Sequence, residues 1–146
     1  MSTPSVTPDL DREQRIGFAE VIYCPGKTDE QLRSAAEALF GRHKNVIASR
    51  ATPEQAELLR EIEPAVEYNS TARTAFLRRD DSNRGRGTVV VVSAGTTDIP
   101  VAEEAACTAE VMGNTVERIF DVGVAGLHRV MAVRERLESA DRKSVV

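Results

Sequence analysis

The segment TVVVVSAGTTDIPVAEEA, residues 88–105, runs from an apolar strand through a turn of small residues into a helix. A second segment, FDVGVAGLHR at residues 120–129, repeats this pattern. A continuous apolar run such as Thr88–Val92 is typical of a strand that is covered on both faces. In open α/β sheets, ligands bind at the carboxyl ends of the strands, where turns of this kind lie. The two segments therefore predict an α/β fold with a candidate ligand site at one edge of its sheet.

The C-terminal half alternates strands and helices. We expect strands at 88–92 and 115–120, helices at 101–112 and 127–140, and a third strand that begins at 144–146. This alternation predicts right-handed crossovers and a doubly wound parallel sheet. Because sheets usually contain about four to six strands, we expect the sheet to be incomplete, with partner strands beyond residue 146 or in another chain.

The N-terminal half predicts a small α/β domain. Its expected helices are 9–15, 30–40 and 53–62, and its expected strands are 18–23, 45–48, 66–68 and 75–77. Gly41 is expected to end the second helix, and Thr52 with Pro53 to begin the third. The predicted organisation is a disordered tail at 1–8, an N-terminal domain at 9–79, a polar linker at 80–87 and a C-terminal domain at 88–146.

The composition excludes several classes of function. The chain has 146 residues and a net charge of −4, and its pI near 5.3 argues against a nucleic-acid-binding protein. No run of about 18 apolar residues predicts a membrane span, and we expect no secretory leader. Two distant cysteines, Cys24 and Cys107, and two histidines do not supply the close-spaced pairs of a zinc site. We therefore expect a cytoplasmic protein, and no motif of the sequence predicts metal ligands.

The first turn has the features of a phosphate site. Gly95, Thr96 and Thr97 precede a helix whose beginning is fixed by Pro100, so free backbone N–H groups and the positive end of the helix dipole meet there. Ser93 adds a further hydroxyl. Asp98 is suited to hold a ribose hydroxyl or to handle a proton. The commoner role of a threonine or aspartate at this place is to cap the helix, and that alternative stays open.

The second turn carries a histidine and an arginine. His128 follows Gly123-Val124-Ala125-Gly126, and a neutral imidazole at a helix start can transfer a proton near pH 7. Arg129 can pair with a phosphate or a carboxylate. Lys27, after the first predicted strand, is another candidate anion contact. A surface histidine and a solvated lysine are the alternatives.

These motifs resemble those of two related families. Ala94-Gly95-Thr96-Thr97-Asp98 and Ala125-Gly126-Leu127-His128-Arg129 are similar to the two site turns of the PurE family of aminoimidazole ribonucleotide carboxylases and mutases, with a glycine in place of the first serine. The chain resembles the LarB family of nickel-pincer cofactor biosynthesis more closely. Four N-terminal segments resemble that family's signature: Asp11-Arg12, Arg15-Ile16-Gly17-Phe18, Glu20-Val21-Ile22-Tyr23 and Gly26-Lys27-Thr28. The more specific segments of the resemblance are residues 93–105 and 121–129.

The LarB resemblance implies an enzyme that acts on nicotinic acid adenine dinucleotide. The implied reaction carboxylates the pyridinium ring with carbon dioxide or bicarbonate and cleaves the phosphoanhydride, which releases AMP. It implies assistance by Mg²⁺, no covalently bound cofactor, and a homo-oligomer in the full-length protein. It also implies phosphate at Gly95–Thr97, Asp98 near the ribose or the reacting centre, and His128 and Arg129 at the carboxylate or phosphate.

Family members continue past the end of this chain with glycine-rich segments and a reactive cysteine. Neither Cys24, in a turn where it can be exposed, nor Cys107, expected to pack inside a helix, lies in the matching motif. We therefore expect no turnover from the 146-residue chain by itself. A PurE-type carboxylase of purine biosynthesis and a non-catalytic nucleotide-binding module are the alternative hypotheses.

Overall fold

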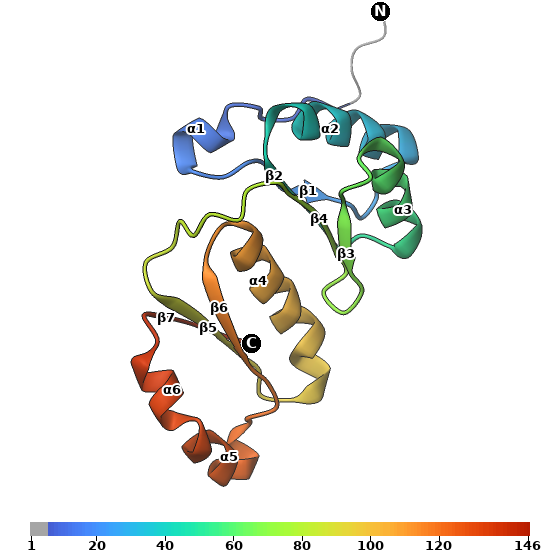
Figure 1. Ribbon diagram of the computed structural model, residues 1–146. Coiled ribbons are helices and arrows are strands. Elements are labelled where there is room, and N and C mark those ends of the chain that lie inside the picture. The colour runs from blue at the N-terminus through green and yellow to red at the C-terminus, as the bar shows by residue number, and fades with distance from the viewer. Residues whose placement is uncertain (1–5) are drawn as a thin grey trace, which may run out of the picture. The chain divides into compact units, whose positions relative to one another are not determined.

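The computed structural model describes residues 6–146, which divide between Asp81 and Ser82 into two compact units (Figure 1). Most of the predicted tail, residues 1–5, lies outside the described residues. The predicted linker is attached at both of its ends. The backbone N–H of Asp80 donates to Asn45 Oδ1 at 3.0 Å in the first unit, and the N–H of Arg84 donates to the Gly113 carbonyl at 2.7 Å in the second.

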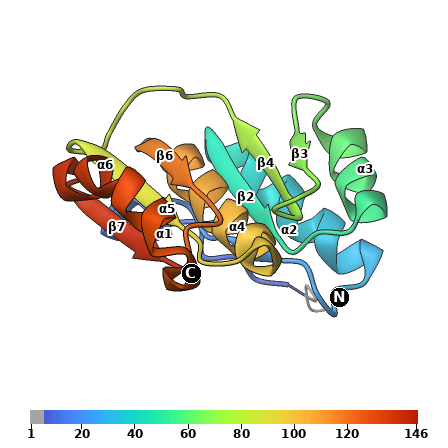
Figure 2. The same ribbon diagram turned by 90° about the horizontal axis from the view of Figure 1, so that it is seen from below.

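The first unit contains a four-stranded mixed sheet and three helices. Its elements are α1 (Arg12–Ile16), β1 (Ile22–Tyr23), α2 (Asp29–Arg42), β2 (Asn45–Ser49), α3 (Pro53–Ile62), β3 (Glu67–Asn69) and β4 (Thr74–Arg78). The strand order is β1-β2-β4-β3, in which β1 and β2 are parallel and β4 is antiparallel to both of its neighbours. Figure 2 shows β2, β4 and β3 side by side. This unit is therefore an α/β domain, as the sequence predicts.

Local sequence explains where α2 and α3 begin. Each helix starts with a reciprocal capping box, in which Thr28 pairs with Gln31 and Thr52 pairs with Gln55. Each threonine hydroxyl accepts a backbone N–H that would otherwise lack a partner in the first turn. The apolar faces of both helices pack on the sheet in one buried core, which includes Leu32, Leu39, Leu59 and Leu77.

Two predictions for the first unit are wrong in extent. The strand predicted over 18–23 is reduced to Ile22–Tyr23, and the carboxylate of Glu20 accepts a backbone N–H from Asp9. The helix predicted to end at Gly41 continues to Arg42, because Gly41 keeps a right-handed conformation. The helix then ends at His43, whose N–H donates to the Leu39 carbonyl at 2.9 Å.

The second unit contains a parallel three-stranded sheet. Its elements are β5 (Thr88–Val92), η1 (Thr96–Asp98), α4 (Ile99–Val111), β6 (Thr115–Ile119), η2 (Val124–Gly126), α5 (Leu127–Ala132), α6 (Arg134–Ser139) and β7 (Arg142–Val145). The strand order is β6-β5-β7, with β5 in the centre. The prediction of a parallel α/β sheet with strands at these places is confirmed.

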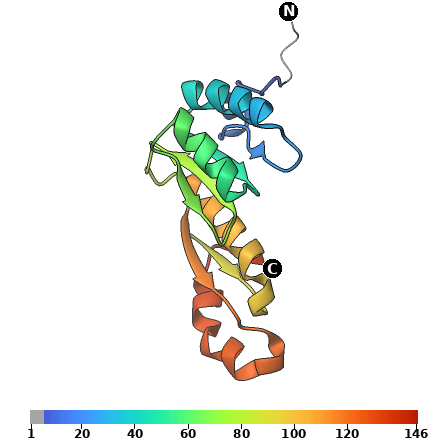
Figure 3. The same cartoon turned by 90° about the vertical axis from the view of Figure 1, so that its right-hand side faces the viewer.

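Alternate residues of β5 belong to two separate cores. Val91 packs with Ala102 and Ala106 of α4, whereas Val90 and Val92 pack with residues of the segment that contains α6. In Figure 3, the gold helix α4 lies along one side of the strands of this unit. Both faces of the central strand are therefore covered, which explains its continuous apolar sequence.

The single helix predicted over 127–140 is wrong, because the structure divides it into α5 and α6 at Val133. Val133 has φ −108° and ψ 6°, outside the helical range. This break accompanies packing of Val133 and Leu137 against the core of the sheet. Leu127 and Met131 remain exposed, by 64% and 53%.

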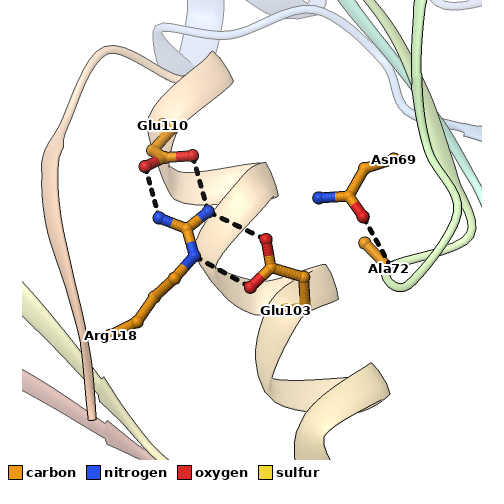
Figure 4. A network of polar contacts seen from close by, with 5 residues as sticks. All are labelled: Asn69, Ala72, Glu103, Glu110 and Arg118. Carbon is orange, nitrogen blue, oxygen red and sulfur yellow. Dashed lines mark hydrogen bonds and ion pairs between the residues drawn. The ribbon is translucent and has the colours of Figure 1, made fainter. Parts of the chain in front are cut away.

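Arg118 of β6 is held by two glutamates of α4 (Figure 4). Its Nε donates to Glu103 Oε2 at 2.8 Å, and its Nη2 donates to Glu110 Oε2 at 2.8 Å. These bonds raise the pKa of Arg118 above its ordinary value, because the two carboxylates favour its charged form. The network therefore ties α4 to the outer strand of the sheet.

Among the described residues, no helix combines the length and the apolar character that crossing a membrane would require.

Candidate functional site

The two predicted turns meet at the carboxyl edge of the second unit's sheet. The backbone N–H of Val122 donates to the Ser93 carbonyl at 3.1 Å, and the N–H of Gly123 donates to the Ala94 carbonyl at 2.9 Å. A Cβ atom on Gly123 would lie 2.9 Å from that same Ala94 oxygen. Glycine is therefore the residue that lets the turn after β6 approach the turn after β5 so closely.

The strand order makes this edge a favoured place for a ligand. From β5 the chain crosses to β6 on one side, and it later returns to β7 on the other side of β5. In doubly wound sheets, ligands bind outside the carboxyl ends of the strands at the point where the strand order reverses. The turn after β5 therefore lies at the switch point of this sheet.

Within the first turn, Asp98 serves as a cap. Its carboxylate accepts the Gly95 N–H at 3.0 Å, and its own N–H donates to the Gly95 carbonyl at 3.1 Å. Thr96 and Thr97 are exposed, so their hydroxyls can be reached from solvent. The helical conformation begins with η1, ahead of the predicted start at Val101.

Ser93 is fully buried, and its hydroxyl is already used. Its Oγ accepts the backbone N–H of Asp121 at 3.3 Å. The structure thus gives Ser93 a part in holding the two turns together, and its hydroxyl does not lie on the surface with those of the threonines.

The second turn places its two predicted site residues in different surroundings. His128 is exposed at the beginning of α5, whereas the Arg129 side chain is 39% exposed. Arg129 Nη1 donates to the Asp121 carbonyl at 2.9 Å and lies 3.0 Å from Asp121 Oδ2. Sequence reasoning missed Asp121, although a charged residue directly after an apolar strand was the signal that could have found it.

Lys27 and the cysteines are not part of this edge. Lys27 lies in the first unit, in the turn before α2, where its N–H donates to the Cys24 carbonyl at 3.1 Å. Cys24 is fully buried, so its expected exposure is wrong, and burial raises the pKa of its thiol to about 11. Cys107 is 3% exposed, in agreement with the prediction that it packs inside a helix.

The turns do not form a metal centre. Across residues 6–146, no three or more His, Cys, Asp or Glu side chains are grouped as a metal ion would require. The carboxylates nearest the edge, Asp98 and Asp121, already have partners within the protein. The described side chains therefore form no cluster of three or more such ligands at this edge.

Comparison with known proteins identifies a family and a relative. Residues 3–79 match the model of the LarB/PurE-like N-terminal domain. An uncharacterised protein of the archaeon Methanocaldococcus jannaschii is 35% identical over 141 residues, an alignment that covers 91% of this chain and 54% of the relative. The chain thus spans about half the length of the curated relative that it matches.

Proposed function

Because this chain belongs to the LarB/PurE-like family, we propose that its second unit binds nicotinic acid adenine dinucleotide for carboxylation of the pyridinium ring. The observation that carries the proposal is the direct hydrogen bonding between the turns after β5 and β6. It brings the exposed threonines and the segment with His128 to one edge of one sheet. The family match covers the first unit, and the alignment with the uncharacterised archaeal relative extends over 91% of the chain and so into the second unit.

In the proposed complex, the phosphates of the dinucleotide lie at the first turn. Thr96 and Thr97 offer exposed hydroxyls there, and α4 directs the positive end of its dipole to the same place. The Asp98 carboxylate accepts the Gly95 N–H and so stabilises the turn. The protein thus recognises an anion mainly through neutral donors, which is compatible with its net negative charge.

The proposed role of His128 is to accept a proton. Carboxylation forms a bond between a ring carbon and the carbon of carbon dioxide, and that ring carbon loses its hydrogen as a proton. An exposed imidazole at the site edge is suited to take this proton near neutral pH. In a separate step, water cleaves the phosphoanhydride, which yields AMP and the dicarboxylated pyridinium mononucleotide.

The covalent chemistry of the whole protein requires a nucleophile that neither cysteine of this chain provides. Cys24 and Cys107 are both buried, and a thiol whose pKa is raised reacts slowly because the thiolate is the nucleophile. We therefore propose that the 146 residues bind the dinucleotide without turning it over.

A thermal-shift and calorimetric comparison of ligands tests this proposal. Nicotinic acid adenine dinucleotide should raise the melting temperature, and aminoimidazole ribonucleotide should not. Thr97→Val removes one exposed hydroxyl at nearly constant volume and should weaken dinucleotide binding by about tenfold. Thr71→Val, at an exposed threonine of the first unit, should leave binding unchanged.

The opposite ligand preference would replace the proposal with a PurE-type activity on an imidazole ribonucleotide. Protection by AMP alone, with no added effect of the pyridinium half, would favour a nucleotide-binding module without catalysis. Equal binding by the wild type and Thr97→Val would remove the first turn from the proposed site.

A further inference from the structure

The guanidinium of Arg129 is held at two acceptors of a single residue. Its Nη1 donates to the Asp121 backbone carbonyl at 2.9 Å and pairs with the Asp121 carboxylate at 3.0 Å. Both groups of the pair are partly exposed, so the pair adds little to stability. Its clearer consequence is geometric, because two acceptors on one residue restrict where the guanidinium can lie.

Gly126 provides the surface on which this guanidinium rests. A Cβ atom at position 126 would lie 2.4 Å from Arg129 Nε and 2.9 Å from Nη2. Gly126 has φ −113°, so its backbone does not itself require glycine. The requirement comes from the close approach of the Arg129 side chain, which any larger residue would displace.

Asp121 adopts a backbone conformation that few residues other than glycine accept. Its φ is +58°, in the left-handed region, where aspartate and asparagine are better tolerated than most residues. Its N–H donates to the buried Ser93 hydroxyl at 3.3 Å. Asp121 therefore connects the buried base of both turns to the guanidinium of Arg129.

We propose that Asp121 is a positioning residue, which holds Arg129 against Gly126 so that the guanidinium meets an anionic group of the ligand in a fixed orientation. We name Asp121, Gly126 and Arg129 the arginine clip. The proposal deepens the proposed function and rests on it for the identity of the ligand. A guanidinium ordered before binding loses less conformational entropy when the ligand arrives.

Two variants separate the clip from the fold. Asp121→Asn removes the negative charge and keeps a residue that tolerates the left-handed backbone. Gly126→Ala leaves Asp121 intact and displaces the guanidinium, whose flexible side chain can move without a backbone clash. Thr71→Val, at an exposed threonine of the first unit, is the matched control. Melting temperatures of all three report whether each variant is folded.

The first readout is the ¹⁵N NMR spectrum of the arginine side chains, which needs no ligand. In the wild-type chain, the Nε–H and Nη signals of Arg129 should be resolved and protected, unlike those of exposed Arg134. Asp121→Asn and Gly126→Ala should each lose these signals, and Thr71→Val should keep them. Averaged Arg129 signals in the wild type, or unchanged signals in Asp121→Asn, would overturn the clip.

The second readout is the affinity for nicotinic acid adenine dinucleotide, which should fall by about tenfold in both clip variants. Equal affinity in the wild type and Asp121→Asn would overturn the positioning role and leave the proposed function standing. A clip that behaves as expected in the spectra, with no dinucleotide binding in the wild type, would overturn the proposed function alone.

Discussion

Asp98 and Asp121 are the two carboxylates beside the proposed site, and each has a partner that defines its role. Asp98 accepts a backbone N–H of its own turn, whereas Asp121 pairs with Arg129. His128, by contrast, is exposed at the start of α5. The residue types at these places could be read from the sequence, but the partners could not, because they depend on how the turns contact one another.

The buried state of Cys24 gives a prediction about its reactivity. Because burial raises the pKa of its thiol from 9.0 to about 11, the native protein at pH 8 should resist a thiol reagent at this position. Buried Cys107 should resist it as well, and both should react after unfolding. Stoichiometric labelling of the native chain at pH 8 would contradict the structure.

The same shift has a consequence for stability. The folded state favours the neutral thiol of Cys24. The stability that this preference contributes is therefore fully present below pH 9 and is lost as the pH rises toward 11. Urea unfolding of the wild type and of Cys24→Ala should therefore be measured between pH 9 and pH 11. The free energy of unfolding should fall more steeply with pH in the wild type.

At the scale of helices and strands, the sequence succeeds where the signal is local. The apolar run of β5 predicts its bounds, and the Thr52 and Gln55 box predicts the start of α3. The break at Val133 could not be predicted. It accompanies packing of this segment against the core of the sheet, and the helical periodicity of the sequence carries no information on that packing. The prediction that Gly41 ends α2 was wrong for a similar reason, because a glycine ends a helix only where the backbone leaves the helical conformation.

Gly41 lies inside α2, where an added Cβ atom would have no other atom within 4 Å, and its φ is not positive. Gly41→Ala should therefore stabilise the chain by about 0.5–1 kcal/mol. Gly123→Ala is the contrasting substitution, because its Cβ would meet the Ala94 oxygen, and it should destabilise the chain. Urea unfolding measures the stability change in each of the two variants. A loss of stability in Gly41→Ala would contradict the helix as described.

Arg118 should matter more to stability than an ordinary surface arginine. Arg118→Ala leaves Glu103 and Glu110 without this partner, and Glu103 is only 13% exposed, so we expect a loss of about 2 kcal/mol. Arg134→Ala breaks a pair whose members are 62% and 61% exposed and should cost less than about 0.5 kcal/mol. Equal losses in the two variants would show that the network is not a stabilising contact.

In the molecule as a whole, the family match and the proposed site fall in different units. Residues 3–79 match the family model, whereas the two site turns belong to Ser82–Val146. The order of strands and helices was enough to predict that both turns lie at one sheet edge. The sequence could not predict that Ser93 and Asp121 hold the turns together, since their hydrogen bond joins residues distant along the chain.

The central claim is that the joined turns of the second unit bind nicotinic acid adenine dinucleotide. The most direct test is a titration of the ¹⁵N-labelled chain with this dinucleotide, followed by backbone amide NMR. We expect saturable shifts concentrated at residues 94–98 and 121–129. Saturable shifts confined to the first unit, or no saturable shifts at either turn, would contradict it.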